Sequence, residues 1–162
     1  MPRSLFASLL ALGLFAVPVT AGAQAGNAQA GSIMVRDAWS RATPGGAKVG
    51  AGYFIVENAG TTPDRLLGAE VDVAGRAEIH QTLESGGVSR MQPVESLVAA
   101  PGSRIEFRPN GYHLMLVDLK RPLARGERLR GSLVFEHAGR VPVEFEVRGI
   151  GAGAGHGAHG AH

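Results

Sequence analysis

Short apolar or alternating runs, separated by Gly, Pro, Asn and Asp, fill the chain between Gly31 and Gly149. The runs are rich in valine, isoleucine, phenylalanine and tyrosine, whose side chains fit the pleated surface of a sheet. They recur about every 8–12 residues with turn signals between them, and none shows a helical period. The pattern predicts strands at residues 32–39, 49–57, 65–73, 76–84, 87–94, 104–107, 112–119, 128–136 and 141–147. We therefore predict an all-β fold, built as a sandwich or a barrel.

The last two predicted strands show this alternation most clearly. Apolar residues occupy every second position on both sides of the turn 137–140, at Leu133, Phe135, Val141, Val143, Phe145 and Val147. One face of the hairpin should pack into a core while the other faces water. We expect His137, which lies in the turn, to be an exposed turn residue and no metal ligand.

The first residues of the chain have the layout of a secretory signal peptide. Arg3 is followed by an apolar stretch over residues 5–19 and then by the small-residue triplet 21–23. A membrane anchor is the alternative, but the apolar stretch falls short of the roughly 20 residues that cross a bilayer. We expect cleavage after Ala23 or Ala25, which would leave an exported, soluble protein without stable membrane insertion.

Composition limits the mature chain to one domain. About 120 residues lie between the signal and a glycine-rich end, which is enough for one sizeable core. We expect a signal peptide over residues 1–23, a domain over residues 24–149 and a flexible tail over residues 150–162. The sequence contains no cysteine, which excludes both a disulfide scaffold and a lipid-modified N-terminal cysteine.

The charged residues do not suggest a nucleic-acid partner. Sixteen Lys and Arg stand against fourteen Asp and Glu, and the two signs are interspersed. One stretch is more basic and contains Lys120, Arg121, Arg125, Arg128 and Arg130. We interpret this stretch as a solvated loop and strand face, with a docking patch for an acidic partner as the alternative.

The end of the chain, residues 149–162, reads GIGAGAGHGAHGAH and has too little apolar content to order itself. Its histidines, His156, His159 and His162, resemble the short tracts that collect metal ions. Imidazole alone suits Cu(II), Ni(II) or Zn(II) better than Cu(I). We interpret the tail as a native, weak metal collector. An inert linker is the alternative, whereas a purification tag would usually have consecutive histidines.

The segment Tyr112-His113-Leu114-Met115-Leu116 brings two metal-binding side chains to one face of a predicted strand. Because side chains alternate along a strand, His113 and Met115 point the same way and the residues between and beside them point the other way. Their backbones lie about 7 Å apart, so both can reach one ion. In a helix the same pair would diverge. Taken alone, each residue type is more often structural than metal-binding.

Methionine and histidine together favour one metal and one oxidation state. Thioether sulfur is a soft donor that favours Cu(I), and imidazole binds both Cu(I) and Cu(II). Two of each would select reduced copper and offer little to Mg(II), Ca(II) or Mn(II), which prefer oxygen ligands. Methionine also avoids the disulfides that thiols form in an exported compartment.

The sequence resembles the PCu(A)C family of periplasmic copper chaperones. The hallmark of that family is His, ten residues, Met, twenty-one residues, His, one residue, Met, and the chain matches it at His80, Met91, His113 and Met115. The resemblance implies that these four residues bind Cu(I).

The similarity continues through residues 37–44, 77–80 and 110–116 and covers the chain from about Ile33 to Val147. It implies a cupredoxin-like Greek-key β-barrel in the periplasm that is not an enzyme. It also implies that the protein carries copper to the copper centres of cytochrome c oxidase. The expected partner is a copper-accepting oxidase subunit or another copper carrier.

The chain departs from some family members next to two of the motif residues. Those members have one methionine soon after the first motif histidine and another just before the next motif methionine. Here Gln81-Thr82 follows His80, and Ser89-Arg90 precedes Met91. No spare thioether is nearby, so a second site for Cu(II) would use other ligands, such as the tail histidines.

Three other functions compete with the copper carrier. An electron-transfer cupredoxin needs a Cys thiolate, which this sequence lacks. A copper oxidase or oxygenase would need a second histidine cluster, and two thioethers leave little room for oxygen chemistry. No persuasive nucleophile and base for hydrolysis stand out. A metal-free β-sandwich that binds a protein or a glycan stays open, and it would make the four-position match a coincidence.

Overall fold

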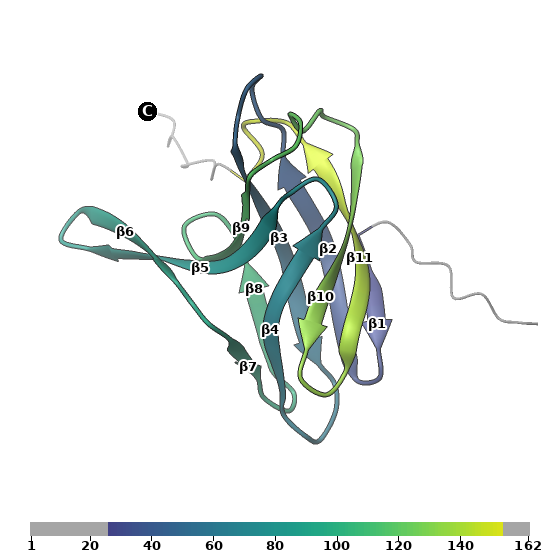
Figure 1. Cartoon of the computed structure of the whole chain (residues 1–162). Coiled ribbons are helices and arrows are strands. Elements are labelled where there is room, and N and C mark those ends of the chain that lie inside the picture. Colours follow the sequence, from purple (N-terminus) through teal and green to yellow (C-terminus); the bar gives the residue numbers. More distant parts are fainter. Residues whose placement is uncertain (1–25, 154–162) are drawn as a thin grey trace, which may run out of the picture.

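Eleven β-strands make up the part of the chain that the computed structural model describes, residues 26–153 (Figure 1). They are β1 (Ala28–Ala30), β2 (Ile33–Arg41), β3 (Val49–Asn58), β4 (Asp64–Val71), β5 (Arg76–Ser85), β6 (Val88–Pro93), β7 (Leu97–Ala99), β8 (Arg104–Phe107), β9 (Tyr112–Val117), β10 (Arg128–Phe135) and β11 (Gly139–Arg148). No helix, and so none that could cross a membrane, occurs between residues 26 and 153. The predicted all-β class is confirmed.

Seven of these strands close into a ring. Starting from β5, the pairings run through β9, β3, β2, β11, β10 and β4 and return to β5. The closing contact is short, with Ala69 of β4 opposite Ala77 of β5. β11 lies parallel to β2, while β2 and β3 are antiparallel, as are β10 and β11. The other four strands attach to this ring: β1 to β2, β7 to β4, β6 to β5, and β8 to both β3 and β9. The fold is therefore a barrel with short additional strands.

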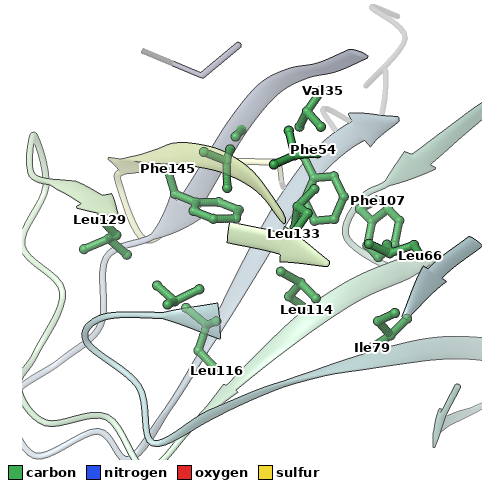
Figure 2. Close-up of a cluster of buried hydrophobic side chains, with 14 of the residues drawn as sticks. Val35, Phe54, Leu66, Ile79, Phe107, Leu114, Leu116, Leu129, Leu133 and Phe145 are labelled. Atoms are coloured by element: carbon green, nitrogen blue, oxygen red, sulfur yellow. The ribbon is translucent and has the colours of Figure 1, made fainter. Parts of the chain in front are cut away.

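Apolar side chains fill the inside of the barrel (Figure 2). Phe54 stacks on Phe107 with ring centres 4.1 Å apart and meets Phe145 edge-on at 6.1 Å. The alternating residues of the last hairpin, Leu133, Phe135, Val141, Val143, Phe145 and Val147, are all buried, as predicted. The interior is a packed core that excludes water and stabilises the ring through apolar burial.

All nine predicted strands are present, with boundaries that differ by at most two residues. The two strands that the sequence pattern missed, β1 and β7, have three residues each. A strand this short shows no alternation that could be recognised. β1 in addition consists of Ala-Gln-Ala, which has little strand propensity.

The β5–β6 hairpin forms an arm that projects from the barrel (Figure 1). The two-residue turn between the strands consists of Gly86 and Gly87, whose φ values are +58° and +77°. Positive φ at both positions is typical of a type I′ hairpin turn, which glycine adopts without steric cost. Every residue of β6 is exposed. The arm is thus held by its turn and its strand pairing, with no buried side chain from β6.

The basic stretch over residues 120–130 is solvated, as expected. Its five cations are all exposed. Arg121 pairs with Glu127 at 2.6 Å, and Nζ of Lys120 donates to the backbone carbonyl of Asp72 at 2.7 Å. The neighbouring acids reduce the net positive charge of this face, and the docking patch stays a hypothesis.

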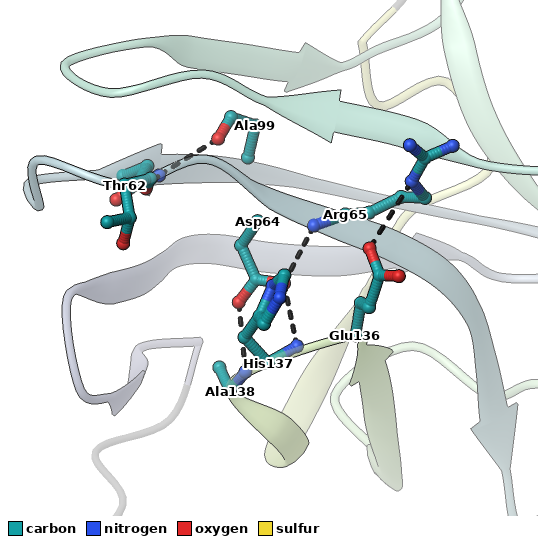
Figure 3. A network of polar contacts seen from close by, with 8 residues as sticks. Thr62, Asp64, Arg65, Ala99, Glu136, His137 and Ala138 are labelled. Atoms are coloured by element: carbon teal, nitrogen blue, oxygen red, sulfur yellow. Dashed lines mark hydrogen bonds and ion pairs between the residues drawn. The ribbon is translucent and has the colours of Figure 1, made fainter.

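Asp64 binds the turn between β10 and β11 (Figure 3). Its carboxylate is 7% exposed. Oδ1 accepts from the backbone N–H of Arg65 at 2.7 Å and of His137 at 3.0 Å, and Oδ2 accepts from the N–H of Ala138 at 2.9 Å. The His137 side chain itself is 70% exposed, as predicted for a turn residue. One buried carboxylate therefore satisfies three backbone donors and fixes this turn.

These hydrogen bonds determine how Asp64 responds to acid. Burial raises the pKa of the carboxyl, but the N–H donors of His137, Arg65 and Ala138 outweigh burial and hold the pKa below its usual 3.8. Because the pKa of Asp64 is lower in the folded than in the unfolded state, its carboxylate stabilises the fold at any pH above the unfolded-state pKa. This stabilisation is lost as the pH falls through the folded-state pKa.

We predict that Asp64→Asn lowers the free energy of unfolding at pH 7 by about 1–3 kcal/mol, because the new amide turns a donor toward Ala138 N–H and leaves it unpaired. Urea unfolding between pH 7 and pH 2 should show the wild type approaching the variant below about pH 4. The control is Glu136→Gln, which removes an exposed partner of Arg65 and should change stability by less than about 0.5 kcal/mol. Equal stability of the two variants at pH 7 would contradict this role of Asp64.

Candidate metal centre

His113 and Met115 lie on the outer face of the barrel wall. They alternate along β9 with Leu114 and Leu116, whose side chains point into the core (Figure 2). β9 thus packs one set of side chains inside and presents the other set outside, as the alternation predicted. His113 is nevertheless only 4% exposed, because neighbouring residues cover it from the outside.

His80 lies directly across the strand pair from His113. β5 and β9 are antiparallel, with His80 opposite His113 and Ile79 opposite Leu114. Ile79, like Leu114, is in the core. The two imidazole rings on the outer face have centres 6.0 Å apart and are tilted by 39°. Strand register therefore brings together two histidines that are far apart in the sequence.

Met91 reaches the same face from the projecting arm. It lies opposite Thr82 in the β5–β6 pair, and Thr82 is two residues from His80, on the same side of β5. The Met91 side chain is 53% exposed, although methionine is commonly buried. Met91 is the most accessible of the four predicted ligands, since His80, His113 and Met115 are all buried or half-buried.

A cavity of about 380 Å³ is lined by Met91, His113 and Met115. Its other walls come mainly from the start of β3 and from the loop before β9, and they include Ala51, Tyr53, Thr82, Pro109 and Asn110. The structure therefore brings three of the predicted ligands to one cavity and sets the fourth, His80, against His113.

Each histidine has one ring nitrogen in a hydrogen bond. Nδ1 of His113 lies 3.0 Å from the carbonyl oxygen of Gly111, and Nε2 of His80 lies 3.0 Å from Oε2 of Glu78. Nδ1 of His80 is buried and has no hydrogen-bond partner among the described residues. The hydrogen bond from His80, followed by that from Arg76, lowers the pKa of Glu78 and favours its ionised form.

Hard ligands are scarce around this cavity. Within residues 26–153, no group of three or more His, Asp or Glu side chains is arranged to hold a metal ion. The predicted ligands on this face are two imidazoles and two thioethers. Such a set would be soft and would suit Cu(I) better than ions that prefer oxygen.

The end of the described chain lies beside the same cavity. The carbonyl of Ala152 accepts a 2.7 Å hydrogen bond from Nε of Arg41, and a Cβ at Gly153 would lie within 3 Å of both Trp39 and Pro109. Arg41 and Pro109 both line the cavity. The first residues of the predicted tail thus pack against the barrel, while His156, His159 and His162 lie outside the described residues.

Sequence reasoning missed two features of this face. Glu78 was not singled out, although its position two residues before His80 places it on the same side of β5. The cavity wall formed by Tyr53, whose ring centre is 4.4 Å from that of Trp39, was also not predicted. Alternation could have indicated Glu78, but the wall depends on pairing between β2 and β3.

Comparison with known proteins identifies a family. Residues 33–147 match the family described as "Putative lipoprotein LpqE-like". A protein of Leifsonia xyli subsp. xyli named "Putative lipoprotein Lxx21020" is 33% identical over 143 residues, which cover 88% of this chain and 85% of that protein.

Solved structures with the same fold include copper proteins. The copper-bound PCuAC domain from PmoF2 matches with a TM-score of 0.66 and 27% identity, over 76% of this chain and 97% of that domain. The solution structure of Cu(I)-bound DR1885 from Deinococcus radiodurans matches with a TM-score of 0.56 and 30% identity, over 68% of this chain and 74% of that protein. These matches confirm the predicted cupredoxin-like β-fold.

Proposed function

The chain belongs to the LpqE-like family and has the fold of a PCuAC domain, and from this we propose that it is an exported copper chaperone. Two structural relatives are copper-bound proteins by name. The family description as lipoproteins supports export. The 162 residues contain no cysteine that could carry a lipid, so the proposed location is the periplasm, reached through the N-terminal signal.

We propose that His80, Met91, His113 and Met115 together bind Cu(I). The observation that supports this most strongly is the common face of these side chains: His80 faces His113 across the strand pair, and the other three line one cavity. Two thioethers and two imidazoles are neutral, soft donors that stabilise Cu(I) over Cu(II). Because each donor is weak and Met91 is exposed, such a site can release its ion by exchanging ligands one at a time.

The proposed role is carriage of copper and not catalysis. In this proposal, four protein ligands leave no open position for a substrate on the ion, whereas catalytic metal sites keep one open. The copper would pass to a copper centre of cytochrome c oxidase or to another carrier. We further propose that His156, His159 and His162 collect Cu(II), because imidazole without thioether favours that ion.

Replacement of His113 and Met115 together by Ala should lower Cu(I) affinity by more than about 100-fold. Loss of the outer partners of metal ligands alone costs 10–100-fold, and this variant removes two ligands. The measurement is competition for Cu(I) against a chelator of known affinity. A matched control, Met34→Ala with His137→Ala, removes one thioether and one imidazole elsewhere and should bind as the wild type does. Unchanged affinity in the first variant would remove these two residues from the site.

Replacement of His156, His159 and His162 by Ala should reduce the number of Cu(II) ions bound and spare Cu(I) affinity. Substitution is preferable to truncation at 150, because it keeps the contact of Ala152 with Arg41. Equilibrium dialysis with Cu(II), alongside the Cu(I) competition, separates the two sites. Equal Cu(II) stoichiometry in wild type and variant would refute a metal-collecting tail.

Cu(I)-loaded protein should transfer its copper to the purified copper domain of a cytochrome c oxidase. Ligand exchange with a tighter acceptor site makes the transfer favourable, and separation of the two proteins followed by metal analysis measures it. The Met34→Ala/His137→Ala control should transfer copper equally well. Retention of copper by the loaded protein, together with turnover of an oxidisable substrate, would contradict the carrier role.

A further inference from the structure

The two histidines of the proposed site have different ring nitrogens free to bind an ion. A carbonyl oxygen can only accept, so Nδ1 of His113 carries the proton that is donated to Gly111, and Nε2 keeps its lone pair. The Glu78 carboxylate accepts from Arg76 through its other oxygen and likewise accepts from His80, so Nε2 of His80 carries the donated proton, and Nδ1 keeps its lone pair. The hydrogen bonds thus select opposite tautomers for the two rings.

Glu78 is itself held from the other side. Nε of Arg76 lies 2.7 Å from Oε1 of Glu78, and Nη1 of the same arginine lies 3.1 Å from Oδ2 of Asp118, just beyond the end of β9. Asp118, Arg76, Glu78 and His80 therefore form a chain of hydrogen bonds that ends at the imidazole. The carboxylate is engaged by Arg76 through one oxygen and by His80 through the other, which fixes the orientation of the ring.

The hydrogen-bonded side chains that lead to His80 are exposed, which indicates that they orient the imidazole and add little to the stability of the fold. The side chains of Arg76 and Asp118 are mostly exposed, and that of Glu78 is 39% exposed. Ion pairs this accessible to water contribute little to folding stability. The ring that they orient, in contrast, is only 12% exposed, and its Nδ1 atom is buried without a hydrogen-bond partner among the described residues. A buried nitrogen lone pair without a partner is unfavourable unless a ligand occupies it.

The spacing of the rings suits one ion between them. Two imidazoles that bind the same ion through nitrogens at about 2 Å have ring centres roughly 5–6 Å apart, and the observed separation is 6.0 Å. Metal-binding histidines commonly donate their second N–H to a carboxylate or a backbone carbonyl, which fixes the tautomer and makes the free nitrogen a better donor. His80 donates to a carboxylate, that of Glu78, and His113 donates to a backbone carbonyl, that of Gly111.

We propose that Glu78 is a positioning residue for His80, and that copper binds Nδ1 of His80 and Nε2 of His113. This inference rests on the proposed copper site and adds the binding atoms and the residue that selects one of them. Glu78 acts through His80 and does not touch the ion, since it accepts from Nε2 of His80 and the ion would bind the other ring nitrogen, Nδ1.

The test is long-range ¹H–¹⁵N spectroscopy of the imidazoles with and without Cu(I), combined with Cu(I) competition. In the wild type, Nδ1 of His80 should be unprotonated, and Cu(I) should shift the resonances of that atom and of Nε2 of His113. Glu78→Ala should give mixed tautomers at His80 and about 10–100-fold weaker Cu(I) binding. Glu78→Gln keeps one acceptor oxygen, for which Arg76 and His80 compete, so this variant should lie between Glu78→Ala and the wild type in both readouts.

The matched control is Glu70→Ala. Glu70 is an exposed carboxylate on β4 that pairs with Arg140, with one contact at 2.7 Å, and its loss should leave both readouts unchanged. A larger Cu(I)-induced shift at Nε2 than at Nδ1 of His80, or wild-type tautomer and affinity in Glu78→Ala, would overturn the inference and leave the copper site standing. No Cu(I)-induced shift at either histidine would overturn the site itself and the inference with it.

Discussion

The register between β5 and β9 is the constraint on which the proposed site depends. Ile79 and Leu114 are opposite each other inside the barrel, so the neighbouring pair, His80 after Ile79 and His113 before Leu114, is opposite on the outside. A shift of one residue would turn the histidines inward and expose the leucine and isoleucine. The apolar core therefore does more than stabilise the fold, because burying Ile79 and Leu114 also fixes the distance between the two imidazoles.

The barrel and the arm supply different kinds of ligand to the proposed site. The barrel holds His80, His113 and Met115 on strands with a packed inner face, which keeps their geometry constant. Met91 comes from β6, whose residues are all exposed. In the proposed site, the rigid ligands would set the selectivity for Cu(I), and the exposed thioether would be the first ligand to be exchanged with a partner.

Much of this arrangement could be predicted from local pattern. Alternation predicted the strands within two residues, the inward and outward faces of the last hairpin, and the common face of His113 and Met115. Periodicity could not place His80 opposite His113, because β5 and β9 are distant in sequence and pairing between distant strands depends on the whole ring. The family motif supplied that pair. Alternation could have placed Glu78 on the same side of β5 as His80, but the hydrogen bond between the two side chains, on which its proposed role depends, is evident only in the structure.

X-ray absorption spectroscopy of the Cu(I)-loaded protein tests the central claim most directly. Sulfur and nitrogen scatter differently, so the ligand shell of the ion reports whether thioethers and imidazoles bind together. We predict two sulfurs and two nitrogens in the first coordination sphere of the wild type, with one sulfur lost in Met91→Ala. A shell of nitrogen and oxygen alone in the wild type would contradict it.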